Sequence, residues 1–495
     1  MITNLPNELL IHIFIFSIPP EGAILTCYSG PPMLSCVSSQ ALVLSRVCSR
    51  WRKLAISIPE LWSTITVDLP LPKDYTFFEV PQEALALHHQ RSQGTPLTIT
   101  VTRDPPDSRP HWSFYSFLAA HSTRVGALHL DRMGSFLECI TAPHPDCPNQ
   151  SPFPLLETLA FQVYGWPFTR DHRKLIDFFR AASFPSLENL SITYLNVDAS
   201  LTFTREFPLP YGQLRTLIFR AHDTVEVPHI LSSCYSLTTL EVELVTLSQN
   251  SLATPSWYGS LIRVSLPNLT EFTVHIYLTE ESYTINNHLL SHLHCPSLVS
   301  LTLQGANKSS YITSGPLLRR STIHAELFEH GVMLFLSTSG CTLTQLTIDT
   351  ISIKSRSLLK LLQTPACSPL RDLCAREGDT RLGWEAESSD FSMDLLRGLF
   401  DPPSESHPRL LPFLRNLRVK VATGFNDVPA ALESIPYFRR VSLDSVVFEI
   451  PDDLAGTHRR DLRKDLAMAI KVVGYPSGDV FAGRVFFCCI LNCPN

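Results

Sequence analysis

The chain has 495 residues, more than one hydrophobic core usually organises, which predicts two or more units or one elongated array. Apolar residues make up 44% and charged residues 17%, and this balance excludes a disordered chain. The net charge of −6 argues against a nucleic-acid partner held through phosphate contacts. Thirteen cysteines at irregular spacing are typical of a reducing compartment rather than of a disulfide framework.

The first regular pattern runs over residues 5–16 and predicts a helix. Pro6 suits the first turn, where its missing N–H costs nothing, and Glu8 faces the positive end of the helix dipole. Apolar residues recur at three- and four-residue intervals: Leu9, Leu10, Ile13 and Phe14. Ile11, Ile15 and Phe16 make the other side apolar too, and a helix that is apolar all round must be covered on more than one side.

A second helical pattern follows at residues 44–55. Its apolar side chains share one face: Leu44, Val47, Cys48, Trp51, Leu54 and Ala55. A unit this short cannot bury two such helices by itself, so something else must cover them.

These pieces resemble the F-box, the helical module that docks on the Skp-type adaptor of cullin–RING ubiquitin ligases. The resemblance rests on several motif pieces in order: Leu5-Pro6-x-Glu8-Leu9, Ile13-Phe14, Val47-Cys48-x-x-Trp51, and Pro59-Glu60-Leu61-Trp62, which is similar to the ending of many fungal F-box proteins. The link between Phe16 and Val37 is longer than usual and contains Pro and Gly. The alternative is an ordinary helical hairpin that caps the next domain.

The resemblance implies a three-helix F-box in residues 1–65, with adaptor-binding and core surfaces built from a short set of residues. These are Leu5, Pro6, Leu9, Ile13, Phe14, Val47 and Trp51. Residues 66–120 then predict a linker with a first helix, at residues 84–88, and a half-buried strand, at residues 97–101, because apolar residues alternate there.

An internal repeat follows, with the pattern Leu-x-x-Leu-x-Leu and aliphatic or aromatic substitutions. Copies begin at Val125, Leu156, Leu187, Leu214, Leu237, Leu269, Leu298 and Leu343, with weaker ones at Leu370, Leu414 and Phe438. The spacings of the first seven copies lie in or just above the range of leucine-rich repeats. Each copy offers one short strand that cannot bury its apolar face alone, so neighbouring copies are expected to stack.

The predicted fold is therefore α/β: the F-box, then an irregular leucine-rich-repeat solenoid with parallel strands and helices on its convex side. The solenoid spans residues 121–450, with inserts at 304–342 and 375–413. We expect an extra helix in the first insert and a short one near residues 393–400 in the second. Residues 451–495 form a C-terminal segment that ends in a capping strand or in a tail without function of its own. The alternative to the solenoid is a conventional sheet with coincidental leucines.

The usual signatures of catalysis and phosphate binding are missing from the sequence. The best metal-like group is His288, His292, His294 and Cys295, but Cys295 occupies the same place before its repeat leucine as Cys234, where a buried thiol is ordinary packing. We expect no enzyme, no metal and no cofactor.

Strand positions that point away from the core are expected to line the concave face of the solenoid and bind the substrate. They are Arg220, Glu241, Glu243, Glu271, His275, Gln304, Arg376, Arg418 and Lys420. The face should be acidic in its middle and basic towards its C-terminal end, which suits a protein or peptide partner better than nucleic acid.

Together these patterns predict the substrate receptor of a Skp–cullin–F-box ubiquitin ligase, which binds the Skp-type adaptor, through it a cullin–RING complex, and a protein substrate. No membrane contact is expected, and the localisation is cytoplasmic or nuclear. An F-box protein that binds the adaptor without ligase function is one alternative, and a hydrolase-like enzyme with a hidden site is another.

Overall fold

The computed structural model describes residues 5–19, 22–26, 36–68, 82–102, 112–131, 153–164, 179, 184–195, 209–222, 227–245, 263–277, 289–306, 331–349, 355–376, 395, 398–399, 410–420, 445–449 and 484–488. The chain divides into two compact units, Met1–Cys234 and Tyr235–Asn495, and each is described by itself. The fold is mixed α/β, with a helical N-terminus and mostly parallel strand pairing, and this part of the sequence prediction is confirmed.

The first unit begins with a helical part, residues 5–63, that we call the helical unit. Its helices are α1 (Asn7–Phe16), α2 (Gln40–Val47), α3 (Ser49–Ser57) and α4 (Glu60–Ser63). The continuous pattern over residues 44–55 is broken at Cys48, whose extended backbone separates α2 from α3. The Cys48 side chain accepts a hydrogen bond from the Trp51 backbone N–H and so caps α3, which the apolar periodicity alone does not reveal.

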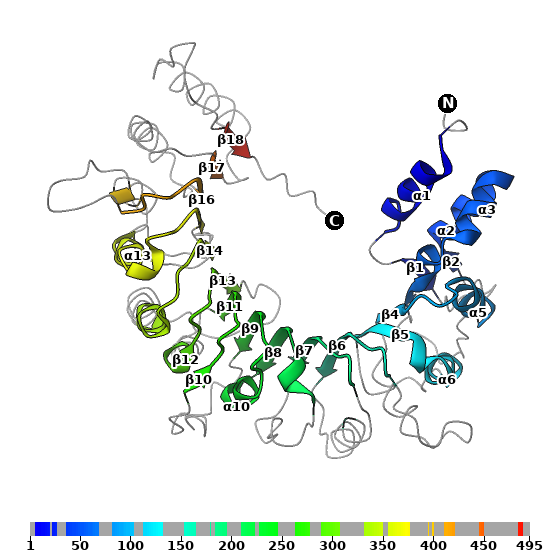
Figure 1. Cartoon of the computed structure of the whole chain (residues 1–495), viewed down its shortest axis with the longest axis horizontal. Coiled ribbons are helices and arrows are strands. Elements are labelled where there is room, and N and C mark those ends of the chain that lie inside the picture. Colours follow the sequence, from blue (N-terminus) through cyan, green and yellow to red (C-terminus); the bar gives the residue numbers. More distant parts are fainter. Residues whose placement is uncertain are drawn as a thin grey trace, which may run out of the picture. The chain divides into compact units, whose positions relative to one another are not determined.

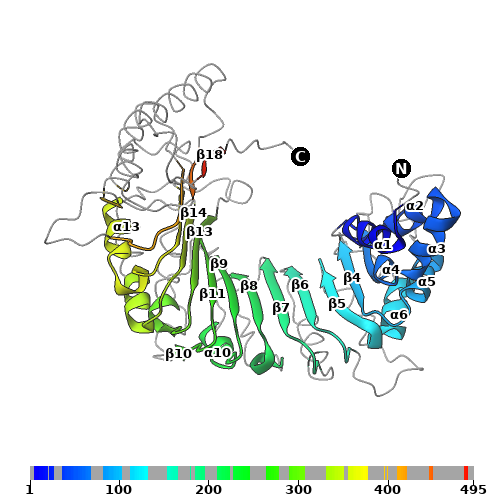
Figure 2. The same cartoon turned by 45° about the horizontal axis from the view of Figure 1, so that its top comes forward.

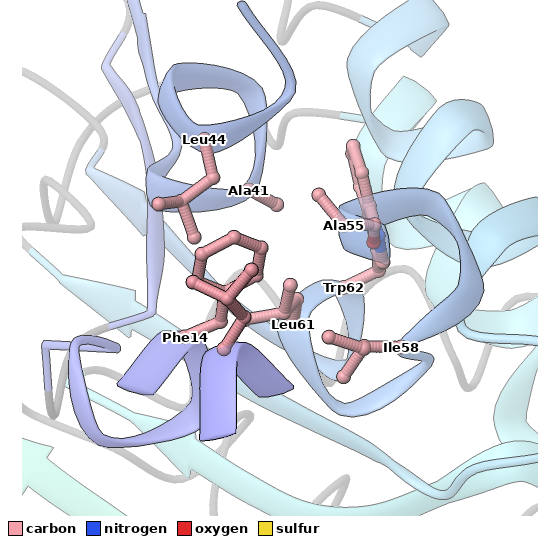
Figure 3. Close-up of a cluster of buried hydrophobic side chains, with 8 residues drawn as sticks. Phe14, Ala41, Leu44, Ala55, Ile58, Leu61 and Trp62 are labelled. Carbon is pink, nitrogen blue, oxygen red and sulfur yellow. The ribbon is translucent and has the colours of Figure 1, made fainter. Parts of the chain in front are cut away.

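The core of the helical unit is a compact apolar cluster (Figure 3). Its buried members are Leu10, Phe14, Ala41, Leu44, Ala55, Ile58, Leu61 and Trp62. The indole N–H of Trp62 donates to the Ala55 carbonyl at 2.8 Å, so the buried ring keeps its hydrogen bond. Leu87, from the helix that follows the next strand, packs partly buried against this cluster. The core of the helical unit is therefore shared with the part of the first unit that contains the sheet.

The sheet of the first unit starts directly after α4. In chain order its strands are β3 (Thr64–Asp68), β4 (Leu97–Thr102), β5 (Val125–Leu130), β6 (Thr158–Tyr164), β7 (Asn189–Leu195) and β8 (Thr216–His222), and neighbours pair in parallel. Helices α5 (Gln82–Arg91) and α6 (Trp112–Ala120) connect β3 to β4 and β4 to β5, and α10 (Val227–Ser232) follows β8 (Figure 1). The predicted helix at 84–88 and strand at 97–101 are confirmed as α5 and β4.

The long link between α1 and α2 contributes two strands to this sheet. Strand β1 (Ala23–Thr26) pairs in parallel with β3, and β2 (Cys36–Ser38) pairs antiparallel with β1. Gly22 precedes β1 with φ of +66°, and a Cβ atom there would lie 2.5 Å from the Thr64 carbonyl oxygen. Only glycine allows this close approach, which sets the described part of the link against the edge of the sheet.

The second unit contains a parallel sheet of the same kind (Figure 2). Its strands follow the order β9 (Thr239–Val245), β11 (Glu271–Tyr277), β13 (Ser300–Ala306), β14 (Gln345–Asp349), β15 (Asp372–Arg376), β16 (Asn416–Lys420), β17 (Ser445–Glu449) and β18 (Arg484–Cys488). The short strands β10 (Val264–Ser265) and β12 (Leu293–His294) pair separately. Residues 331–339 and α13 (Ser355–Leu362) are helical segments between strands.

The repeat leucines are buried where the structure describes them. In the copy that starts at Leu298, for example, Leu298, Leu301 and Leu303 all have no exposed surface. Before the strand, the Leu298 N–H donates to the Cys295 carbonyl at 3.2 Å and closes a turn that has Pro296 at its second position. Equivalent turn bonds join Leu187 to Phe184 and Leu414 to Leu411.

A backbone hydrogen-bond ladder links one repeat to the next within each unit. The Glu157 carbonyl accepts the N–H groups of Glu188 and Asn189, at 3.0 and 2.9 Å. In the second unit, the Thr270 carbonyl accepts those of Val299 and Ser300, both at 2.9 Å. Each strand entrance is thus held at the same register, which puts equivalent side chains of neighbouring strands in rows.

The last predicted copy needs a correction. Its strand was expected to start near Phe438, which lies outside the described residues, but the strand that pairs with β16 is Ser445–Glu449. Val446 and Phe448 are the Cα partners of Leu417 and Val419. They therefore occupy the strand positions that the prediction gave to the second and third apolar residues of the copy starting at Phe438. Apolar alternation fits both segments, and only pairing with β16 selects one.

The inserts and the C-terminus agree with the sequence in part. Residues 331–339 are helical in the first insert, with Val332, Phe335 and Leu336 buried, and residues 395 and 398–399 are helical in the second. Strand β18 extends the sheet beyond β17, as the capping-strand alternative predicts.

Candidate functional site

Exposed apolar side chains gather on the helical unit. Of the twelve large apolar residues that are exposed among the described residues, seven lie in it: Leu9, Ile13, Ile15, Phe16, Val43, Val47 and Ile56. Soluble chains seldom leave so many large apolar side chains open in one small region unless a partner covers them.

Helix α1 carries two separate apolar stripes. Leu10 and Phe14 are four residues apart and wholly buried in the core. Figure 3 shows the Phe14 ring within this cluster. Leu9, Ile13 and Phe16 follow i, i+4, i+7 spacing and are 50%, 49% and 86% exposed. The second stripe therefore lies outside the core that the helical unit builds for itself.

Helix α2 adds a second exposed stripe, formed by Val43 and Val47, which are 55% and 57% exposed. The Arg50 guanidinium donates to the Asn7 side-chain oxygen, at 2.7 Å from Nη2, and to the Leu5 carbonyl. These bonds fix the start of α1 to the start of α3, and Val47 lies just before that start. Both exposed stripes thus reach the same hydrogen-bonded corner of the helical unit.

The structure separates the predicted adaptor-binding residues into two groups. Pro6, Leu9, Ile13 and Val47 are exposed, whereas Leu5 and Trp51 are half-buried against the core. Phe14 belongs to the core part of this set, because it is wholly buried and its ring packs against Trp51 at 4.9 Å between centroids. Phe14 therefore packs inside the helical unit and has no exposed surface with which to contact a partner.

The predicted adaptor-binding set leaves out two exposed apolar residues of the helical unit, Phe16 and Val43, whose side chains are 86% and 55% exposed. Their sequence spacing could have identified them. Phe16 lies seven residues after Leu9 and Val43 lies four residues before Val47, so each shares a helix face with a predicted residue. Sequence periodicity could not say which of the two stripes on α1 would be left uncovered.

A group of histidines joins the helical unit to the sheet. His88 is wholly buried, its ring packs on Trp62 at 5.0 Å, and its Nδ1 lies 3.2 Å from the Trp62 carbonyl. His89 stacks on His121 at 3.7 Å between centroids. Burial lowers the pKa of both rings, and that of His89 falls to about 4, with the charges of His121 and Arg124 adding to the effect. Burial lowers the pKa of His88 as well.

A second candidate surface is the sheet face opposite the buried leucines, which we call the open face. In the first unit, equivalent side chains across β3 to β8 form a row of small or neutral residues: Thr66, Thr100, His129, Ala160, Ser191 and Ile218. The predicted residue Arg220 is exposed at the end of a second row, beside Thr193. Charge is sparse on this face.

The open face of the second unit carries more charge. Glu241, Glu243, Glu271, His275 and Gln304 alternate with buried residues along β9, β11 and β13, and they are half-buried or exposed. His275 Nε2 lies 3.0 Å from Glu241 Oε1, and both side chains keep part of their surface open. The predicted substrate-binding residues of these strands are therefore brought together on one face.

The other predicted residues of this face lie on β15 and β16. Arg376 and Lys420 are Cα partners, and Arg418 pairs with Cys374 one step back along the strands. Arg418 is exposed. The backbone register thus places three basic positions within two neighbouring strands.

The cysteines before the repeat leucines are packing residues in the structure. Cys234, Cys295 and Cys367 are wholly buried, and burial raises the pKa of the first two thiols to about 12. In the metal-like group, His294 Nδ1 lies 3.0 Å from the Thr338 carbonyl and His288 lies outside the described residues. Within the described ranges no group of three or more metal-ligating side chains comes together.

Among the helices in the described part of the chain, none has both the length and the apolar character needed to cross a bilayer.

Comparison with known proteins gives one positive result. A family model described as F-box-like matches residues 2–68, which covers the helical unit and β3. None of the curated proteins compared with this sequence is similar enough to count as a relative. The N-terminal part of the chain is thus an F-box-like domain, a type of module that takes part in protein–protein interaction and generally binds Skp-type adaptors.

Proposed function

We propose that this protein is the substrate-recognition subunit of a Skp–cullin–F-box ubiquitin ligase. The observation that carries the proposal is the pair of exposed apolar stripes, Leu9-Ile13-Phe16 and Val43-Val47, on an F-box-like domain. Large apolar side chains at these exposures gain most from burial against a partner, at about 1.5–3 kcal/mol for each fully covered side chain. A Skp-type adaptor is the partner that such a domain generally takes.

The remainder of the chain is proposed to be a leucine-rich-repeat-like solenoid that binds the substrate. Support comes from the buried leucines at equivalent places of parallel strands and from the backbone ladder that connects them. Stacked repeats of this kind expose one continuous row-patterned face, which is their usual binding surface.

The proposed mechanism is proximity. The receptor holds a protein substrate near the ubiquitin-conjugating enzyme that the cullin–RING subunits recruit, and so raises the effective concentration of the reacting groups. The chain supplies no catalytic group in this scheme, and it works in the cytoplasm or nucleus, where its cysteines stay reduced.

The sharing of a core between the F-box-like domain and α5 supports this mechanism. Leu87 packs on the domain's core and Arg91 lies over the Trp62 ring, with its guanidinium carbon 4.6 Å from the ring centroid. Strand β3 follows α4 without a linker. Within the first unit, an adaptor bound to the exposed stripes would be held in a fixed relation to the sheet.

Co-purification of the full chain with a Skp-type adaptor tests the proposal. We expect wild type to retain the adaptor and Leu9→Ser to lose it. Leu155→Ser is the matched control, because Leu155 is also a leucine of about the same exposure, 45% against 50%, but lies in a repeat turn. A folded wild type that does not bind, or equal loss in both variants, would contradict the proposal.

Adaptor binding by itself leaves the ligase role open. The second experiment compares the ubiquitin conjugates recovered with wild type and with Leu9→Ser in cells where the endogenous adaptor is present. Conjugates that depend on Leu9 support a substrate receptor. Adaptor binding without any change in conjugates would instead assign the chain to F-box proteins that act without ligase function.

A further inference from the structure

We infer that the partner surface which covers α2 and α3 is acidic, and that its carboxylates meet a basic corner of the helical unit formed by Arg46, Arg52 and Lys53. These opposite charges speed association and make it sensitive to salt. The inference rests on the proposed function, because the partner is the Skp-type adaptor proposed above, and it adds the charge that the adaptor's contact surface carries.

The stretch of chain around α2 and α3 contains cations but no carboxylates. From Gly22 to Pro59 the sequence has no Asp or Glu, whereas it has four residues that are cationic at neutral pH: Arg46, Arg50, Arg52 and Lys53. The whole chain has more acidic than basic residues, 46 against 40. A local excess of positive charge in an acidic chain attracts anionic groups to this place in particular.

Three of the four cations make up the basic corner. Arg46 is exposed on the last turn of α2, and Arg52 and Lys53 are exposed on α3, which packs against α2 (Figure 1). The Arg52 Nε atom donates to the Ser45 carbonyl at 2.9 Å, so its guanidinium is held at the same turn of α2 that carries Arg46. The fourth cation, Arg50, is half-buried and donates to the start of α1 instead.

Carboxylates of the described chain do not neutralise this corner. The acidic residues described up to α5 are Glu8, Glu60, Asp68 and Glu83. None of them forms an ion pair with Arg46, Arg52 or Lys53. The helical unit itself has four basic residues and two of these acidic ones, which leaves an excess of two positive charges among its described residues.

The basic corner borders an exposed apolar stripe. Arg46 lies three residues after Val43 and directly before Val47, so all three share one side of α2. On α3, Lys53 precedes the exposed Ile56 by three residues. A partner that covers Val43 and Val47 therefore brings the rim of its own surface against these cations. Carboxylates at that rim are attracted to the corner, whereas a basic rim is repelled.

A nucleic acid or an anionic membrane would also be attracted by three cations. The net charge of −6 opposes both, because the acidic remainder of the chain is repelled by their phosphates. The F-box-like match over residues 2–68 favours a protein partner. An acidic protein surface is thus the occupant that fits both the charge and the type of module.

Stopped-flow measurement of association between the full chain and a purified Skp-type adaptor tests the inference. Arg46→Glu/Lys53→Glu should lower the association rate constant by about tenfold or more at about 50 mM salt. At about 500 mM salt the difference from wild type should shrink to about twofold or less, because the charges are exposed and screened. The dissociation rate should change less than the association rate, as is usual for charges at the rim of an interface.

The matched control is Arg263→Glu/Arg371→Glu, because both residues are exposed and lie outside the helical unit. Each reversal lowers the net charge by two, so both double variants change it from −6 to −10. We expect the control to associate at nearly the wild-type rate. Equal slowing in the two double variants would show that the net charge of the chain, and not the basic corner, governs association.

Zero-length cross-linking locates the carboxylates directly. Lys53 is the only lysine within the matched residues 2–68. A carbodiimide joins its amine to a carboxylate in contact with it and takes up the water that the new amide bond releases. We expect mass spectrometry to find Lys53 linked to an Asp or Glu of the adaptor. Lys53→Arg keeps the charge and should keep the association rate while losing the link. A bound adaptor that gives no link to wild type would contradict the inference.

The outcomes separate this inference from the proposed function. A folded wild type that does not bind the adaptor overturns the proposed function. Adaptor binding whose rate is unchanged by salt and by Arg46→Glu/Lys53→Glu overturns only the inference. Sedimentation with phosphatidylcholine vesicles that contain phosphatidylserine provides the counter-test. Vesicle binding that is lost in Arg46→Glu/Lys53→Glu would assign the basic corner to a membrane surface and would also overturn the inference.

Discussion

The helical unit and the repeat strands use similar apolar residues in opposite ways. Along β11 and β13 every second residue is buried, whereas the described side chains of the opposite face, Glu271, Thr273 and His275 on β11 and Ser300, Thr302 and Gln304 on β13, are polar. On α1 the core takes one apolar stripe and leaves another, Leu9-Ile13-Phe16, exposed. The repeat strands thus bury their apolar faces by pairing with neighbouring strands, whereas the helical unit leaves one apolar stripe exposed, as the proposed adaptor binding requires.

The strongest test of this comparison replaces two phenylalanines of one helix. Phe14→Ala should lower the free energy of unfolding by about 3–5 kcal/mol, because it removes a wholly buried ring. Phe16→Ala removes a ring that is 86% exposed and should change stability by less than about 0.5 kcal/mol. Urea titration followed by circular dichroism measures both. Similar losses in the two variants would show that Phe16 belongs to the core.

A matched pair in the second unit tests the repeat side. Leu301→Ala should cost about 2–5 kcal/mol, because Leu301 is wholly buried between neighbouring strands. Leu334→Ala, on the helical segment 331–339, removes a side chain that is 36% exposed and should cost much less. Hydrogen exchange of the β11 and β13 amides locates the loss. Protection that falls equally in both variants would mean that the strand leucines carry no special share of stability.

The link between α1 and α2 provides a smaller effect. Gly22→Ala should destabilise the first unit by about 1–3 kcal/mol, since it adds left-handed strain and a clash with the Thr64 carbonyl. Gly340→Ala has the same φ sign but nothing within 4 Å of the added atom, so only the strain of about 1 kcal/mol applies. Thermal unfolding of the two variants gives the comparison. An equal shift would mean that β1 does not lie against β3.

The smallest effect concerns pH. The pKa of His89 is lowered to about 4, so between its ordinary value of 6.5 and about 4 the unfolded chain binds more protons than the folded one. Stability is therefore complete above about pH 6.5 and decreases as the pH falls, by at most about 1.4 kcal/mol per pH unit for a single histidine. The half-exposed position of His89 makes the measured slope smaller.

His89→Phe should flatten this slope while it keeps a ring stacked on His121. The His89 Nε2 atom makes no hydrogen bond to the described residues, so replacing the imidazole by a phenyl ring removes no hydrogen bond at that atom. Melting temperatures from pH 4 to 7 give the slope. The pKa values of His88 and His121 are also lowered, so part of the pH dependence of stability should remain in the variant. An unchanged slope in the variant would show that His89 is not the group responsible.

The repeated part of this protein follows from local patterns in its sequence. Leu-x-x-Leu-x-Leu places its second and third leucines on one face of any strand, and a strand with one apolar face has to stack, so parallel pairing and burial at Leu301 or Leu240 followed. It also determined that α1 was too apolar for its own core, because both stripes are local properties of a 3.6-residue period.

Which stripe of α1 is buried depends on tertiary contacts, since Leu10 and Phe14 pack on residues from α2, α3 and α4 that no local pattern relates to them. It also decided that β17 starts at Ser445, and that the link after α1 joins β3 at the sheet edge. These outcomes depend on contacts between segments distant in the chain. Such contacts are settled by which pairing buries the most apolar surface and satisfies the most backbone groups.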